Sequence, residues 1–167
     1  YLTQFCEKIL SRIPGRRILS TDIYPLLYTR GEYVISTMWL EHMSHYARYA
    51  KENGADFHMF IQAYSSGEQR EISSREELTF QIYTDMAFGV RGFSYFTYRK
   101  SFLEGFGGGC VENDVSCTPT KLYAWAQEVN REIQSFDHVY LAFEWEGVYP
   151  VGGSDRLAED PTYVNNL

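Results

Sequence analysis

The feature that most constrains the fold is a pattern that occurs three times, a strand-like apolar run followed by an amphipathic helical run. The strand-like runs begin at Ile18, Phe57 and Phe93, about 35 to 40 residues apart, which is the length of one strand-plus-helix unit. In such units the helix returns the chain to the edge where the strand began, so successive strands run parallel. The sequence therefore predicts an α/β fold of parallel strands alternating with helices.

Local signals set the boundaries of these units. Pro14-Gly15 and Asn53-Gly54 end two helical patterns, and Ser74 with Glu77 has the spacing of a capping box. We expect strands over 16–23, 57–64 and 92–98. We expect helices over 2–13, over about 33–53, from Ser74 to Gly89, and from Thr118-Pro119 to about Ile133.

The length of the chain limits how much of a closed barrel it can form. A complete (β/α)8 barrel takes about 250 residues, whereas this chain has 167. We therefore expect part of a TIM-type barrel over residues 1–150. Within this range, residues 138–151 are expected to form a further strand or helix end, and 151–167 are expected to be a polar tail.

Charge and composition exclude several classes of function. The formal net charge is −7 with no basic cluster, which argues against nucleic acid as a partner. There is no apolar run of membrane-spanning length and no visible signal peptide, so we expect a soluble chain and leave its compartment open. Aromatic residues, at 17%, are unusually frequent and suit either a core or ring platforms for a ligand.

Metal and cofactor patterns are weak. His42 and His45 lack a third ligand, and the three cysteines show no metal-type pairing, so we expect no metal. We expect free thiols, the alternative being a bridge between Cys110 and Cys117 in an oxidising compartment. No phosphate-binding or nucleophile-elbow pattern occurs, and no cofactor is expected. The glycine-rich run 105–110 lacks the context of a dinucleotide-binding turn, and we expect it to form a flexible loop at the rim.

Polar and aromatic residues occur where the three strands are predicted to end. Ligands of parallel α/β proteins bind at the carboxyl ends of strands, which favours a polar, ring-lined site for a polyhydroxylated ligand. Asp22 is the candidate catalytic residue. The candidate substrate-binding residues are Tyr24, Gln62, Tyr64, Tyr95 and Tyr98. The structural alternatives are an Asp22 that caps a turn or pairs with Arg30, a Gln62 bonded to backbone, and tyrosines packed in the core.

Four segments resemble the later strands of bacterial glycoside hydrolase-like (β/α)8 barrels. They are ILSTDIYPLL (18–27), FHMFIQAY (57–64), EELTFQIYTDMAFGVRGFSYFTY (76–98) and CTPTKLYAWAQEVNREI (117–133). The resemblance covers about residues 1–150, and its third segment is the most specific. It implies that these residues are the C-terminal half of such a barrel, and that Asp22, Gln62 and Tyr95 to Tyr98 belong to its sixth, seventh and eighth strands.

The resemblance implies carboxylate-based hydrolysis of a glycosidic bond in a site that upstream strands complete. Glycosidases usually use two carboxyl groups, and the strand ends of this chain offer Asp22 alone. The resemblance places Gln62 where many retaining barrel glycosidases carry a glutamate nucleophile. A non-catalytic carbohydrate-binding or assembly module therefore remains the alternative. An aldolase or isomerase is disfavoured because no lysine ends a strand.

An incomplete barrel also predicts association. Its outer strands would have unpaired edges, which tend to find partners. We therefore expect self-association in addition to a carbohydrate ligand.

Overall fold

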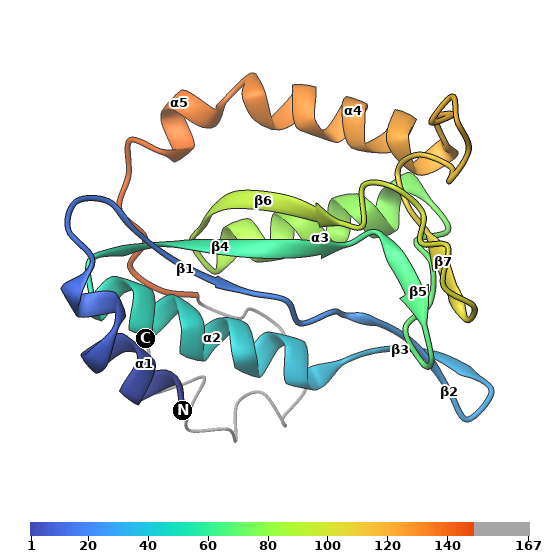
Figure 1. Cartoon of the computed structure of the whole chain (residues 1–167). Coiled ribbons are helices and arrows are strands. Elements are labelled where there is room, and N and C mark those ends of the chain that lie inside the picture. The colour runs from blue at the N-terminus through green and yellow to red at the C-terminus, as the bar shows by residue number, and fades with distance from the viewer. Residues whose placement is uncertain (149–167) are drawn as a thin grey trace.

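The computed structural model describes residues 1–148 and shows a mixed α/β fold built on a three-stranded parallel sheet (Figure 1). In spatial order the strands are β1 (Arg17–Thr21), β4 (Ala55–Gln62) and β6 (Val90–Phe96). Leu19 pairs with Phe57, and Met59 pairs with Phe93. The predicted alternation of parallel strands and helices is confirmed.

Helices precede β1 and lie between and after the strands of the parallel sheet along the chain (Figure 1). They are α1 (Leu2–Lys8), the 3-10 helix η1 (Leu10–Arg12), α2 (Thr37–Glu52), α3 (Arg75–Ala87), α4 (Lys121–Gln134) and α5 (Asp137–Tyr140). Ser74 caps α3 by accepting a hydrogen bond from the backbone of Glu77, as the capping-box spacing predicts. Gly89, with a φ of 79°, follows the end of α3 and supplies the left-handed conformation that terminates many helices.

The helices α2, α3 and α4 pack on the same face of the sheet. One apolar cluster joins α1 and α2 to Leu19, Phe57 and Met59, and a second joins α3 and α4 to Ile61, with Tyr95 packed against it. These strand residues alternate with residues that point to the other face. Ser20 and Ser94 of that face are exposed, as are Ile18 (48%) and Phe96 (40%).

Two antiparallel strand pairs extend beyond the carboxyl ends of the parallel strands (Figure 1). They are β2 (Leu26–Thr29) with β3 (Glu32–Ile35), and β5 (Tyr64–Ser66) with β7 (Phe106–Gly108). Arg30 and Gly31 form the turn between β2 and β3, with φ values of 54° and 81°. Two consecutive positive φ values are typical of the tight turn that suits a twisted hairpin.

These two antiparallel strand pairs correct two predictions. The helix expected from about Tyr33 begins only at Thr37, because residues 32–35 form β3 instead. The glycine-rich run 105–110 is not simply a loop, because its first part forms β7. A side chain at Gly108 would lie 2.7 Å from Cα of Tyr64, so this close pairing requires glycine.

Smaller differences concern the ends of the chain. The first predicted helix ends at Lys8 and continues as η1, and α4 begins at Lys121, three residues later than expected. Residues 138–151 were expected to contain a strand or helix end, and their described part begins within the short helix α5. The predicted tail, 151–167, lies outside the described residues. Among residues 1–148 we find no helix with the length and hydropathy needed to cross a bilayer.

Candidate functional site

Asp22 lies at the carboxyl edge of the parallel sheet. It directly follows β1 and is exposed, as expected for a carboxylate delivered to a rim. Within the described residues it forms no ion pair, so the predicted alternative of a bridge to Arg30 is not observed there. Its charge is therefore available to whatever approaches this edge.

Four rings from different segments form a wall near Asp22, which we call the rim aromatic cluster: Tyr24, Tyr64, Phe96 and Phe106. The centroid of the Tyr64 ring lies 5.0 Å from those of Tyr24 and Phe96, and both contacts are edge-on. The Phe106 ring stacks on Tyr64 at 6.3 Å. Both tyrosines are 8% exposed, whereas Phe96 and Phe106 are 40% and 37% exposed. The cluster thus has a buried polar base and an accessible apolar surface.

The two tyrosines of the cluster are electrostatically linked to Asp22. Burial and then the negative charge of Asp22 raise the pKa of Tyr24 well above its ordinary value. The same two causes raise the pKa of Tyr64. The Tyr24 hydroxyl is buried and finds no hydrogen-bond partner among the described residues. Because this hydroxyl is enclosed, the polar group that a ligand can reach at this edge is the carboxylate of Asp22, which accepts hydrogen bonds from hydroxyl groups.

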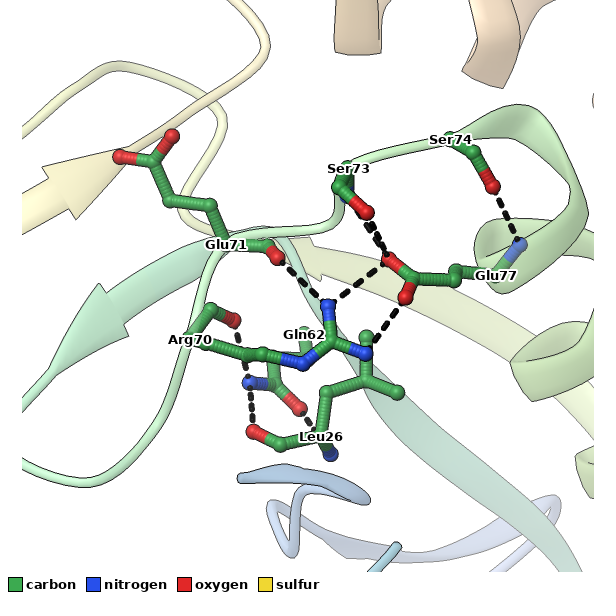
Figure 2. Close-up of polar contacts among 7 residues, drawn as sticks. All are labelled: Leu26, Gln62, Arg70, Glu71, Ser73, Ser74 and Glu77. Atoms are coloured by element: carbon green, nitrogen blue, oxygen red, sulfur yellow. Dashed lines mark hydrogen bonds and ion pairs between the residues drawn. The ribbon is translucent and has the colours of Figure 1, made fainter. Parts of the chain in front are cut away.

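Gln62 lies below this rim and is fully buried. Its amide oxygen accepts a 2.8 Å hydrogen bond from the backbone N–H of Leu26. Its amide nitrogen donates to the carbonyl oxygens of Leu26 and Arg70, at 2.8 and 2.9 Å (Figure 2). Gln62 therefore connects β2 and the segment after β5 to the end of β4. This is the backbone-bonded amide that the sequence left open as the structural alternative to a ligand contact.

The other two predicted tyrosines, Tyr95 and Tyr98, are not part of the rim aromatic cluster. Tyr95 pairs with Ile61 and packs with the helix-covered side, where its hydroxyl donates a 2.8 Å hydrogen bond to Asn130 of α4. Tyr98 is 59% exposed in the segment after β6. The structure thus brings together Asp22, Tyr24 and Tyr64 among the predicted site residues.

The cluster also contains two residues that sequence reasoning missed. Phe96 ends β6 on the face opposite Tyr95, and its position follows once the register of β6 is known. Phe106 belongs to β7, which the run of glycines concealed. Alternation along GFSYFTY was the available signal for Phe96, but no comparable signal marks Phe106.

Two hollows lie near β5 and β7 and share Glu71 in their linings. One of about 240 Å³ lies against the start of α4 and is lined by Lys100, Glu112 and Trp125, among others. The other, of about 370 Å³, lies against β5 and the β2–β3 hairpin. Asp22 lines neither hollow and instead stands on the open side of the rim.

No metal-binding cluster of three or more histidine, cysteine or acidic side chains occurs in residues 1–148. His42 contacts the carbonyl of Met38 within its own helix. All three cysteines are free thiols, as predicted.

Comparisons with known proteins add no family to this picture. No family model, no curated protein and no solved structure matches the chain. Function therefore has to be inferred from the geometry of its own side chains.

Proposed function

We propose that residues 1–150 are part of a (β/α)8-type barrel whose carboxyl rim binds a carbohydrate. In this proposal Asp22 acts as acid, base or charge stabiliser in hydrolysis of a glycosidic bond. Upstream strands would complete the barrel and supply the second carboxyl group that this chemistry usually needs.

The order of the strands supports a barrel rather than an open doubly wound sheet. The strands β1, β4 and β6 are neighbours in sequence order, and α2, α3 and α4 all pack on one face. Doubly wound sheets carry helices on both faces, whereas a barrel carries them only outside. The uncovered face with Ser20 and Ser94 would then point to the barrel interior.

One observation carries the functional part of the proposal. The exposed carboxylate of Asp22 stands near a wall of rings, of which Phe96 and Phe106 are partly exposed. Sugars present apolar C–H faces and hydroxyl groups together, so an accessible ring surface with a carboxylate acceptor nearby matches both parts.

A second candidate is a module that binds carbohydrate without cutting it. The observation that favours it is the use of Gln62, whose amide is committed to backbone groups and cannot ionise. Asp22 would then bind a sugar hydroxyl and would have no partner carboxylate for catalysis.

Asp22→Asn tests the catalytic form of the proposal. We expect turnover of aryl glycosides by the chain to fall about 10²- to 10⁴-fold in the variant, the usual contribution of an acid or base. The matched control is Asp137→Asn, which changes a half-exposed aspartate of α5 away from the rim (Figure 1). Equal turnover by Asp22→Asn and the unmodified chain would reject Asp22 as catalytic. Absence of turnover in both would leave only the binding form for this chain.

Light scattering tests the incomplete barrel. The outer strands β1 and β6 each pair on one side only within the described residues. Unpaired edges favour association with other chains, so we expect a dimer or larger species. A compact, well-folded monomer would contradict a barrel of which these residues form only part.

A further inference from the structure

A pair of exposed tyrosines lies on the β2–β3 hairpin. The tight turn at Arg30-Gly31 sets Tyr28 opposite Tyr33 in the antiparallel register. Directly opposed residues of a hairpin project on the same face, and the two ring centroids are 5.1 Å apart. The side chains are nevertheless 48% and 74% exposed. We call this pair the tyrosine platform.

The ring of Tyr33 in the platform packs against the charged side chain of Arg70. The guanidinium carbon of Arg70 lies 4.9 Å from the centroid of the Tyr33 ring, which is within the range of a cation–π contact. Arg70 is bound in turn by both carboxylate oxygens of Glu77, and Ser73 donates two further hydrogen bonds to that carboxylate (Figure 2). The side chain of Arg70 is 15% exposed.

This support has an energetic consequence for binding. An exposed ring that moves freely loses conformational entropy when a ligand orders it, whereas a ring already fixed loses less. Tyr33 is therefore preorganised although most of its surface faces solvent.

The hollow beside the platform has the chemistry of a sugar site. Its volume is about 370 Å³, and the two rings form its apolar part. Two glycines and the polar residues Ser65, Ser66, Glu68, Gln69, Arg70 and Glu71 form the rest. Rings can stack on the C–H face of a sugar while these polar groups hydrogen-bond its hydroxyls.

Two residues that line the hollow are sequence neighbours of residues in the rim aromatic cluster. Ser65 directly follows Tyr64 of the cluster, and Gly105, which lines the hollow, directly precedes Phe106. The hollow and the cluster are therefore close in space, along the same short strand pair.

We propose that the tyrosine platform binds additional sugar units of an extended oligosaccharide, whose first units occupy the rim beside Asp22. This inference rests on the proposed function and makes it more specific, because it names an oligosaccharide or polysaccharide rather than a monosaccharide as the ligand. A proline-rich peptide is the other class that stacks on exposed tyrosines. The hydroxyl, amide and charged groups that line the hollow, together with its closeness to the rim aromatic cluster, favour sugar.

Calorimetric titration of the whole chain tests the inference. The probes are cello-, xylo- and galacto-oligosaccharides of one, two, four and six units, with a proline-rich decapeptide as the competing class. We expect affinity to rise with sugar length, and Tyr33→Ala to weaken binding of the longer probes about tenfold while leaving the shortest unchanged. Tyr33→Phe keeps the ring and should bind as the unmodified chain does.

The control is Phe143→Ala, which removes an equally exposed ring, 70% exposed, from the segment after α5. It should not change any affinity. If short sugars bind and Tyr33→Ala leaves the gain with length intact, the platform is not a subsite, and the proposed function stands. If no sugar of any length binds, the proposed function fails and the inference fails with it. Binding of the peptide without any sugar would also overturn both.

Discussion

Replacing Gln62 with leucine is expected to lower the free energy of unfolding by about 3 kcal/mol, whereas the same change at Gln81 is expected to leave it unchanged or raise it. Both side chains are fully buried and have the same size. Gln62 serves three backbone groups, the N–H and carbonyl of Leu26 and the carbonyl of Arg70. Leucine would remove the partner that Gln62 gives to the Leu26 N–H and to the Arg70 carbonyl, at about 1 to 3 kcal/mol for each unsatisfied group, whereas the Leu26 carbonyl still accepts a hydrogen bond from the backbone N–H of Arg70.

Gln81 is the matched comparison. It lies on α3, and neither its amide nitrogen nor its amide oxygen has a partner among the described residues. Leucine removes two buried polar atoms there and orphans nothing, a change that is often neutral or stabilising. Urea unfolding followed by tryptophan fluorescence compares the two variants. Equal destabilisation by both would contradict the distinction between them.

The succession of units was predictable because it depends on local and periodic signals. Runs such as 57–64 fit a strand in a parallel sheet, and Ser74 with Gly89 marks both ends of α3. These signals act over a few residues and survive in the folded state. They determine the class of fold, α/β, although they do not by themselves close a sheet into a barrel.

The β2–β3 hairpin was missed for a local reason. Its turn is Arg30-Gly31 rather than the Asn-Gly or Asp-Gly that usually marks such turns. Ile35 lies four residues before Trp39 and so continues the apolar spacing of α2 backward by one turn, which gave β3 the pattern of a helix. The hairpin positions the tyrosine platform, and one wrong boundary therefore hid a candidate binding surface.

The roles of Gln62 and Tyr95 could not be read from the chain for another reason. The partner of Gln62 at Leu26 is 36 residues away, and a buried amide gives no sequence signal of what it bonds. Tyr95 faces the helices because a register shift between Phe57 and His58 sets which residues of β6 point inward. The roles of Gln62 and Tyr95 both depend on pairing between residues that are far apart in the sequence.

Asp85 carries the second large expected effect. It lies on α3, it is fully buried, and neither carboxylate oxygen has a hydrogen-bond partner in residues 1–148. Burial raises the pKa of Asp85 well above its ordinary value, and the nearby indole of Trp39 offsets this only in part. The carboxyl group is therefore held in its neutral form over a pH range in which the unfolded chain has released the proton.

The sign of the pH dependence follows from this difference. Between the pKa of an unfolded aspartate, about 3.9, and the raised pKa of the folded state, the folded state binds the extra proton. The contribution of Asp85 to stability is thus fully present below about pH 4 and is lost as pH rises toward the folded pKa. Asp85→Asn has nearly the same shape and never ionises, so it avoids this loss.

We therefore expect Asp85→Asn to be more stable than the unmodified chain at pH 8, by at least about 1 kcal/mol, and the difference to shrink on acidification toward pH 4. Chemical unfolding of both proteins at several pH values measures it. The other titrating groups are common to both proteins and cancel in the difference. Asp137→Asn, at a half-exposed aspartate of α5, is the control for the exchange of aspartate for asparagine itself. A difference for Asp85→Asn that did not change with pH would mean that this carboxyl group ionises in the folded state as it does in the unfolded chain.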